Sequence, residues 1–350
     1  MNKIDRISEL PDPILEHILA FIPMKQILQL SILSKRWKNV CTLFPIPEFE
    51  QQLFTNSFHE VPPSKRKKEY RRKKQEFKNF VGRYLLGHYR QRLSINKFKL
   101  HMMLDGESDC ALLNRWIDYV IECNVKELNL DVWIHQKRYE LPERALVAKS
   151  ITELKLSQCK LKSFYSEINL PSLKKLDLEI IVENQVVQTL FDGCRNLEEM
   201  RFEYCYGLKS LQVSVLPKLK VIELIDNPQL ENVEIEASNL ESLLLNLKRS
   251  CQINLGRVLK RINISGHRMK SLAIIYCSEL VEVDIVTPNL DRLEYGGGVI
   301  SFSLSTSSLS ELSLTFNDSS DVEKIEFLAN LNHPKLLNWK TVKAEVRIRA

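Results

Sequence analysis

From residue 125 onward the chain repeats one six-residue pattern, L-x-x-L-x-L, in which apolar side chains fill the first, fourth and sixth positions. Most copies begin 19–26 residues after the previous one. The units start at Val125, Ile151, Leu173, Leu197, Leu219, Leu240, Met269, Leu290 and Leu309. The fourth and sixth positions share one face of a strand and point inward. A single unit cannot close a core but stacked units can, so the pattern predicts a solenoid of parallel strands.

The ninth position of each unit supports this phase. Repeats of this kind place a Cys or Asn there, which hydrogen-bonds the turning backbone. Five residues occupy it, namely Cys159, Cys205, Asn227, Cys277 and Asn317. Four of the nine units lack it, and residues 249–267 fit no unit, so the register in that stretch stays open.

A second set of strands is expected on the opposite wall. Its members are LKSLQV at Leu208, LENVEI at Leu230 and LVEVDI at Leu280, each about 11 residues after a unit of the first set. The predicted fold class is therefore α/β: a leucine-rich-repeat solenoid with a parallel concave sheet and a strand-rich convex wall, preceded by three N-terminal helices.

The N-terminal helices are short and unusually apolar. Asp12 is expected to cap the first helix and Pro23 to end it, and Ser34 is expected to cap the third. A second helix should pass through Ile27, Leu28 and Leu30. From residue 4 to 40, 18 of 37 residues are apolar, which is more than so small a unit can bury alone. We expect a partner protein to cover the surplus.

The segment DRISELPDPILEHILAFIPMKQILQLSILSKRWKNV resembles the F-box of the large plant F-box/leucine-rich-repeat family (F-box, FBD/LRR-like). The blocks WIDYVIECNVKELNLDVW, YELPERALVAKSITELKLSQCKL and GCRNLEEMRFEYCYGLKSL resemble the same family. Two departures stand out: a heavier basic insert, and a tail from residue 321 to 350 that does not clearly continue into the family's common C-terminal domain.

The resemblance implies a substrate-recognition subunit of an SCF-type (Skp–cullin–F-box) ubiquitin ligase. Its F-box would bind a Skp-type adaptor, and through it a cullin scaffold, while the repeats bind a target protein. The alternative is a nuclear leucine-rich-repeat scaffold that acts outside a ligase. By motif position, the adaptor-binding residues would be Leu10, Pro11, Ile14, Leu15, Ile18, Leu28, Leu33, Ser34 and Trp37. Some of the apolar residues in this segment, Leu19 and Leu30 especially, could instead hold the helices together.

A basic stretch separates the F-box from the repeats. Residues 64–78 contain nine Lys/Arg against Glu69 and Glu76, a net charge of +7 within a chain of +6. Prolines at 45, 47, 62 and 63 suggest a connector, and an apolar stripe from Phe77 to Leu85 predicts that a helix begins near Tyr70. The predicted domains are 1–44 (F-box), 45–105 (connector with a basic helix or arm) and 106–350 (solenoid with tail).

This stretch has three possible roles: a solvated helix face, a nuclear-import signal or, least favoured, a nucleic-acid patch. The import residues would be Lys65, Arg66, Lys67, Lys68, Arg71, Arg72, Lys73 and Lys74. Nuclear residence is therefore expected alongside a cytoplasmic pool.

Outward strand positions on the concave sheet change character along the solenoid. The early repeats are charged, with Glu127, Asp131, Glu153, Lys155, Lys175, Asp177, Glu179, Glu199, Arg201 and Glu203. The middle repeats turn apolar at Val221, Ile225, Leu244, Ala273 and Ile275. Such an apolar patch beside charged positions predicts a target-binding site, unless a loop or the tail covers it.

No catalytic constellation is visible in the sequence. Gly296-Gly297-Gly298 lacks the context of a phosphate loop, and the eight cysteines form no C-x-x-C pair. We expect no enzyme activity, cofactor or metal. No apolar run reaches the length of a membrane span and the N-terminus shows no signal pattern, so a nuclear or cytoplasmic location without membrane association is expected. The repeats do not reveal the target or any small-molecule co-ligand.

Overall fold

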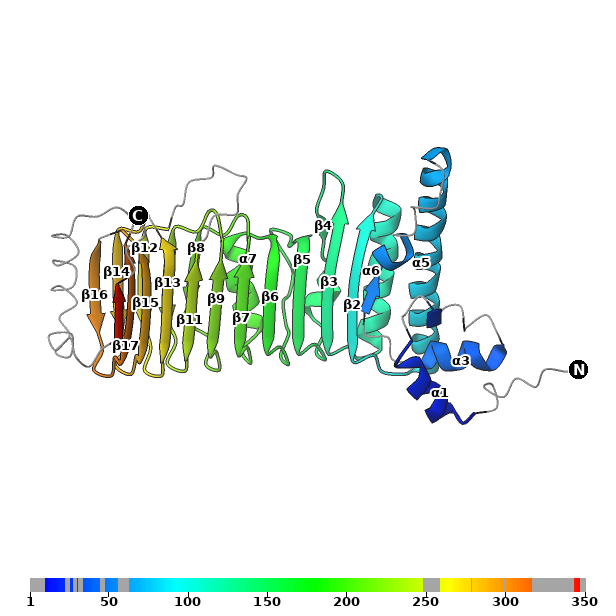
Figure 1. Ribbon diagram of the computed structural model, residues 1–350, viewed down its shortest axis with the longest axis horizontal. Coiled ribbons are helices and arrows are strands. Elements are labelled where there is room, and N and C mark those ends of the chain that lie inside the picture. The colour runs from blue at the N-terminus through cyan, green and yellow to red at the C-terminus, as the bar shows by residue number, and fades with distance from the viewer. Residues whose placement is uncertain are drawn as a thin grey trace, which may run out of the picture. The chain divides into compact units, whose positions relative to one another are not determined.

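The computed structural model describes residues 10–22, 26–27, 30, 34–44, 48–55, 63–247, 259–277, 279–298, 300–316 and 343–346. The chain divides into two compact units, Met1–Ala145 and Leu146–Ala350, which we describe in turn (Figure 1).

The first unit begins with the F-box helices α1 (Asp12–Leu19) and α3 (Lys35–Leu43). As predicted, Ser34 caps α3, because its side chain accepts a hydrogen bond from the backbone N–H of Trp37 at 3.1 Å. Asp12 is the first residue of α1 and not its cap, and its carboxylate pairs with Arg36 at 2.7 Å. Pro23, Leu28 and Leu33 lie outside the described residues, as does most of the predicted second helix.

The F-box helices enclose a small core of their own. Leu15, Leu19, Ile27, Trp37, Val40 and Cys41 are all buried in it. The partly buried Leu10, Ile22, Leu30 and Phe44 pack against this cluster. The side chains of Leu19 and Leu30 therefore hold the helices together, which was the alternative role considered for them.

The rest of the first unit combines helices with a short parallel sheet. Its elements are β1 (Glu48–Glu50), α4 (Gln52–Thr55), α5 (Pro63–Gln91), β2 (Lys97–Leu104), α6 (Glu107–Glu122), β3 (Glu127–Ile134), β4 (Tyr139–Glu140) and a 3-10 turn at Glu143–Leu146. Strand β2 pairs in parallel with both β1 and β3. The expected stripe on α5 is confirmed: Phe77, Phe80, Val81, Tyr84 and Leu85 are buried.

Two features differ from the sequence prediction. Helix α5 starts at Pro63, several residues before Tyr70, because proline is well suited to the first turn of a helix. Range 45–105, predicted as a connector, also contains β1, α4 and β2. Ile95, Phe98 and Leu100 repeat the L-x-x-L-x-L spacing and are buried, so β2 belongs to the repeat pattern.

The second unit is built from two parallel sheets. The first contains β5 (Glu153–Lys160), β6 (Lys175–Ile181), β7 (Glu199–Glu203), β9 (Val221–Ile225), β11 (Ser242–Asn246), β13 (Ser271–Cys277), β15 (Arg292–Gly297), β17 (Glu311–Phe316) and β18 (Lys343–Val346), in this spatial order. All strands predicted from the first-set units are present, β3 of the first unit included. Their fourth and sixth positions are buried, as at Leu154 and Leu156.

The second sheet confirms the expected strands on the opposite wall. Its order is β16 (Ser301–Ser305), β14 (Glu282–Val286), β12 (Arg261–Ser265), β10 (Asn232–Glu236) and β8 (Ser210–Val213). Strand β12 falls in the stretch that fitted no unit, where Leu259, Ile262 and Ile264 carry the pattern. Helix α7 (Asn184–Gly193) lies at the β8 edge, where Asn184 donates to the hydroxyl of Ser210 at 2.7 Å.

The ninth position closes the turn after each first-sheet strand. Cys159, Cys205, Asn227 and Cys277 are buried there, whereas Asn317 lies outside the described residues. The residue just before each of the four has a left-handed backbone: φ is 61° at Gln158, 47° at Tyr204, 46° at Asp226 and 61° at Tyr276. This conformation is uncommon for residues other than glycine. The hydrogen bonds of the ninth residue help to stabilise it.

Candidate protein-interaction surfaces

Two large apolar side chains among the described F-box residues are exposed, although the core residues of the described helices are buried. Ile14 is 47% exposed and Phe21 is 77% exposed. Pro11 is exposed, and Leu10, Ile18 and Ser34 are half-buried. These residues together are called the F-box surface below, on which Ile14 and Phe21 present apolar side chains to solvent.

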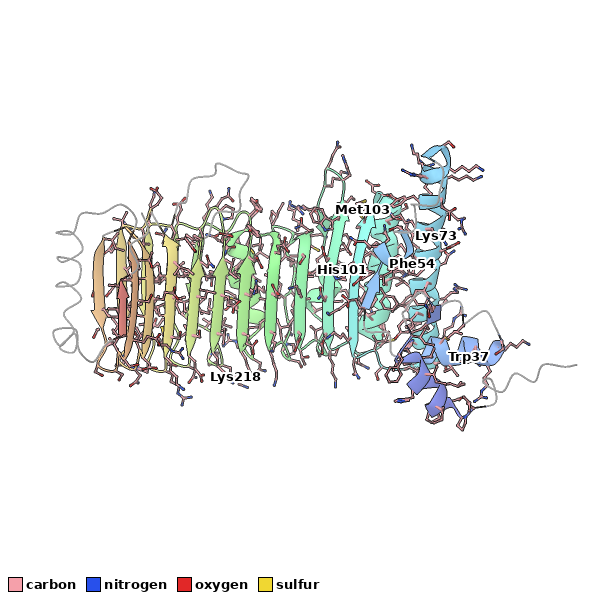
Figure 2. All side chains as sticks on the ribbon, viewed as in Figure 1. Trp37, Phe54, Lys73, His101, Met103 and Lys218 are labelled. Atoms are coloured by element: carbon pink, nitrogen blue, oxygen red, sulfur yellow. The ribbon has the colours of Figure 1, made fainter. Side chains whose placement is uncertain are left out.

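The predicted adaptor contacts do not all lie on this surface. Leu15 is fully buried, and Trp37, which Figure 2 labels, is 3% exposed, so both are core residues in this structure. Their contact with an adaptor stays a prediction, without an exposed surface to support it. Phe21 was not among the adaptor contacts predicted from the sequence, and its only sequence signal is its place in the same apolar run. In the structure its ring packs edge-on against that of His17, with the ring centroids 5.1 Å apart.

The charged outward positions of the first sheet pair across neighbouring strands. Parallel register places Lys155 beside Asp177, and their side chains lie 2.5 Å apart. Arg201 contacts Glu223 of the next strand at 3.0 Å and Glu203 of its own strand at 2.7 Å. Exposed pairs of this kind add little stability, about 0–1 kcal/mol each. These pairs neutralise part of the charge, but the ten outward positions named for the early repeats still carry seven carboxylates against three cations.

The predicted target-binding residues form a mixed surface in the middle of the same sheet. Val221, Ile225, Leu244, Ala273 and Ile275 are all partly exposed, and we call this set the middle patch. Leu244 is the register partner of Ala273, whereas Asn246 separates Ile225 from Ile275. Outward-facing apolar side chains beside the paired carboxylate of Glu223 are typical of a protein interface.

The basic residues of α5 fall into two groups. Toward the middle of the helix, Lys74 is buried and reaches Asp105 at 2.6 Å, and Lys78 reaches Asp109 at 2.6 Å. Lys73 contacts Glu76 at 3.2 Å, and Arg72 pairs with Glu69 and Glu76. Lys65, Arg66, Lys67, Lys68 and Arg71 are exposed on the first turns. Of the predicted import residues, Lys74 therefore faces the protein interior.

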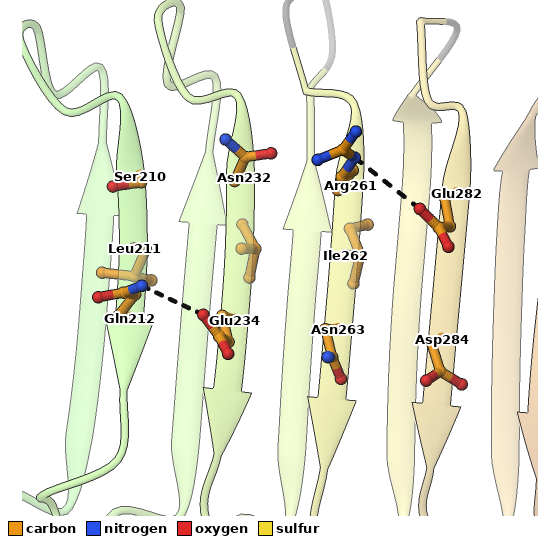
Figure 3. A pocket seen from close by; sticks show the side chains of 11 residues that line it. Ser210, Leu211, Gln212, Asn232, Glu234, Arg261, Ile262, Asn263, Glu282 and Asp284 are labelled. Atoms are coloured by element: carbon orange, nitrogen blue, oxygen red, sulfur yellow. Dashed lines mark hydrogen bonds and ion pairs between the residues drawn. The ribbon is translucent and has the colours of Figure 1, made fainter.

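The outward face of the second sheet is mostly polar, with Val286 as an exposed apolar residue. A hollow there is lined by Ser210, Gln212, Asn232, Glu234, Arg261, Asn263, Glu282 and Asp284, together with the apolar Leu211, Val233 and Ile262 (Figure 3). Gln212 donates to Glu234 at 3.1 Å, and Arg261 lies 3.8 Å from Glu282. Such polar cross-strand pairs are typical of a sheet face that is exposed to solvent.

The ionisable groups give little indication of covalent chemistry. Burial raises the pKa of Cys41 to about 11 and that of Cys194 to about 12, which keeps both thiols protonated at neutral pH. Among the described residues all cysteines are free, and no group of acidic, histidine or cysteine side chains is arranged to hold a metal ion. None of the described helices combines the length and apolar character needed to cross a bilayer.

The chain combines a small N-terminal helical module, which exposes apolar side chains, with stacked parallel repeats. This combination defines a leucine-rich-repeat protein with an N-terminal helical domain. Comparisons with known proteins agree. The F-box domain family matches residues 7–49, and the family described as "At1g61320/AtMIF1, LRR domain" matches residues 86–270. The chain belongs to this leucine-rich-repeat family and carries an F-box at its N-terminal end.

The relatives include three Arabidopsis thaliana proteins. "Putative F-box/LRR-repeat protein At5g41840" is 30% identical over 56% of this chain and 36% of its own length. "Putative F-box/LRR-repeat protein At3g18150" is 28% identical over 71% of this chain and 50% of its own length. "F-box/FBD/LRR-repeat protein At5g56420" is 28% identical over 66% of this chain and 55% of its own length. The chain thus spans between about a third and about half of the length of these relatives.

Proposed function

We propose that this chain is the substrate-recognition subunit of an SCF-type ubiquitin ligase. In this role the F-box surface binds a Skp-type adaptor, and the adaptor links the chain to a cullin scaffold. The observation that carries the proposal is the exposure of Ile14 and Phe21 on helices whose described core residues are buried. Large apolar side chains in such a position are best explained by a partner that covers them.

The repeats would supply target recognition, with the middle patch as the binding site. The chain itself would perform no chemistry. Its contribution would be proximity, because holding a target beside an activated ubiquitin thioester raises the effective concentration of the target's lysines.

The adaptor contact can be tested by co-expression of the full chain with a Skp-type adaptor. Ile14→Asp with Phe21→Asp should abolish co-purification, because burying two carboxylates at the interface is costly. The matched control is Val281→Asp with Val286→Asp, which alters two exposed valines of the second unit, 61% and 47% exposed, and should retain the adaptor. Adaptor retention by the Ile14/Phe21 variant, or adaptor loss in the control, would contradict the proposed surface.

The ligase role needs a second measurement, because an F-box can also work in a scaffold. A purified chain–adaptor complex should capture a cullin and, once supplied with the activating enzymes, extend ubiquitin chains. An adaptor complex that never recruits a cullin would favour the alternative of a leucine-rich-repeat scaffold outside a ligase.

The middle patch is tested by Ile225→Asp with Ile275→Asp in the adaptor-bound chain. Partners that co-purify with the unaltered chain should be lost, while the thermal melt stays unchanged. The control Ser265→Asp with Ser305→Asp adds the same charge to outward positions of the second sheet and should keep those partners. Retention of every partner by the Ile225/Ile275 variant would exclude the patch.

We also propose that the chain resides partly in the nucleus, with the exposed basic residues of α5 as the import signal. The supporting observation is that Lys65, Arg66, Lys67, Lys68 and Arg71 are accessible to a receptor, whereas Lys74 is buried. Alanine at these five positions should shift a tagged protein to the cytoplasm. An unchanged distribution would remove the proposal.

A further inference from the structure

The first unit carries an exposed apolar pair on the outward face of its sheet. Trp133 of β3 is 53% exposed and Met103 of β2 is 51% exposed. The parallel register makes these two residues direct neighbours. The indole N–H of Trp133 donates to Asp131 at 3.1 Å, which fixes the plane of the ring. We call this pair the Trp133–Met103 platform.

The basic end of α5 lies next to this platform. The hydroxyl of Tyr70 is 4.0 Å from the sulfur of Met103, and Gln51 bridges the two, since it donates to Tyr70 at 3.2 Å and accepts from the backbone N–H of Met103 at 3.2 Å. Lys67 stands one helical turn before Tyr70 on the same face. Figure 2 shows Met103 on β2 with Lys73 on the adjacent α5, and Figure 1 shows α5 continuing past the end of β2.

The charge beside the platform is positive on the α5 side. Residues 63–71 contain five Lys/Arg and one Glu, a net charge of +4. Within the part of the chain that the structure describes, no carboxylate lies within ion-pair distance of Lys65, Lys67, Lys68 or Arg71. Glu69, the one acid in this range, pairs with Arg72.

Three carboxylates on the sheet side, Asp131, Glu48 and Glu127, each have a basic neighbour. His101 lies 3.0 Å from Asp131 and 3.3 Å from Glu48, and Glu127 pairs with Lys97. A basic partner would be repelled by the cations of α5, and on the sheet side it would find Asp131, Glu48 and Glu127 already beside His101 or Lys97. An acidic partner would meet Lys65, Lys67, Lys68 and Arg71, for which the described residues provide no ion-paired carboxylate.

We propose that the Trp133–Met103 platform and the first turns of α5 together bind an acidic segment of a partner protein that also presents a large apolar side chain. The apolar side chain would rest on Trp133 and Met103, and the neighbouring Asp or Glu residues would face the cations of α5. Tryptophan is among the residues that dominate interface energies, and complementary charge guides the encounter. The inference deepens the proposed target recognition and rests on it for the partner's role as a target.

A single-stranded nucleic acid fits this surface less well. Such ligands stack successive bases on several aromatic rings along a continuous basic groove. Here the platform consists of one indole and a thioether, which offers a single ring for base stacking.

The test uses the full chain in complex with the Skp-type adaptor, or alone if the adaptor does not bind. A display library of short random peptides is selected on the immobilised protein. The recovered peptides should combine Asp or Glu with Phe, Trp, Leu or Met, and a synthetic copy should bind more weakly as salt rises, because exposed charges are screened. Binding is the only readout, so failure of the ligase role would leave the result interpretable.

Two variants locate the binding site. Trp133→Ala should weaken the selected peptide about tenfold or more, as expected for a hot-spot residue. Its control is Phe164→Ala, which removes an exposed aromatic residue of the second unit. Lys67→Glu with Lys68→Glu should also weaken binding, whereas Lys209→Glu with Lys218→Glu changes net charge equally and should not.

Several outcomes would overturn the inference. The first two are selection of basic peptides and no enrichment of any peptide. The third is equal peptide binding by Trp133→Ala and the unaltered chain. The fourth is that the protein retains single-stranded RNA or DNA, and not peptides, in a way that depends on Trp133 and Lys67. Thermal melts of each variant separate lost binding from unfolding, and because all altered side chains are exposed, the melts should be unchanged.

Discussion

The side-chain oxygen of Asn227 accepts a hydrogen bond from the backbone N–H of Cys205, one repeat earlier, at 2.9 Å. Its amide nitrogen donates to the carbonyl of Phe202 at 2.9 Å. One buried side chain thus satisfies both a donor and an acceptor of the preceding turn. This arrangement is consistent with a small polar residue at the ninth position. At Cys159, Cys205 and Cys277 a thiol instead donates weakly to a nearby carbonyl, as Cys205 does to that of Leu178 at 3.2 Å.

Asn227→Leu should lower the free energy of unfolding by about 2–4 kcal/mol, because it leaves two buried backbone groups without a partner. The measurement is urea unfolding of the full chain. Asn239→Ala is the control: Asn239 also donates to a backbone carbonyl, that of Pro217, but the bond is exposed and its loss should cost about 1 kcal/mol or less. Equal losses in the two variants would contradict the assigned role of Asn227.

The contact between α5 and α6 should weaken in acid. Burial alone would raise the pKa of Asp109, but hydrogen bonds from Lys78 and from the backbone N–H of Asp105, with the charges of Lys78 and Lys74, hold that pKa below its ordinary value. A lowered folded-state pKa stabilises the fold above the unfolded pKa, and this stabilisation is lost as pH falls through the folded value.

The melting temperature of the first unit should therefore fall as pH drops below about 4, near the ordinary pKa of an aspartate. Asp109→Asn should be less stable at neutral pH, because it removes the charge that faces Lys78 and the buried Lys74. It should also show a smaller decline in acid. The check is a series of thermal melts from neutral to acidic pH, and an identical acid decline in Asp109→Asn would show that other carboxyls are responsible.

The sequence predicted the solenoid well because its signal is local and repeated. Strand periodicity places every fourth and sixth position inside, and nothing in the tertiary structure has to override it. Strand β2 was missed although Ile95, Phe98 and Leu100 carry the same spacing, because it follows directly on the long basic helix. Strand β12 was missed because the interval from Leu240 to Met269 is wider than in the other units.

The exposure of individual F-box side chains could not be predicted in the same way. Ile14 and Leu15 are adjacent and chemically alike, yet one is 47% exposed and the other fully buried. The difference depends on the rotation of an eight-residue helix, which a nearly continuous apolar run does not specify. The burial of Lys74 could not be predicted from the sequence either. A lysine is rarely buried unless it is paired, and its partners Asp105 and Asp109 come close only in the folded structure.

The thiols should differ in reactivity according to burial. Desolvation raises the pKa of both Cys194 and Cys205 to about 12, so neither forms a thiolate at about pH 8. Burial and the charges of Asp109 and Glu107 also raise the pKa of Cys110, but its side chain is only half-buried. Iodoacetamide should therefore modify Cys110 before Cys194 and Cys205, and peptide mass spectrometry over time measures the order of modification. In denaturant all three should react at similar rates, and early modification of Cys205 in the native protein would contradict its burial.

Trp37→Ala should unfold the F-box instead of simply removing a contact. The indole is 3% exposed and packs with Leu15, Leu19 and Val40, and replacing a buried tryptophan by alanine costs about 3–5 kcal/mol. So small a core has no comparable reserve of stability. The variant should therefore lose adaptor binding together with protection of the first helices from limited proteolysis. Phe21→Ala, at an exposed position, should weaken adaptor binding while that protection is kept. If Trp37→Ala lost adaptor binding but kept its protection from proteolysis, Trp37 would be a direct adaptor contact and not a residue that stabilises the F-box core.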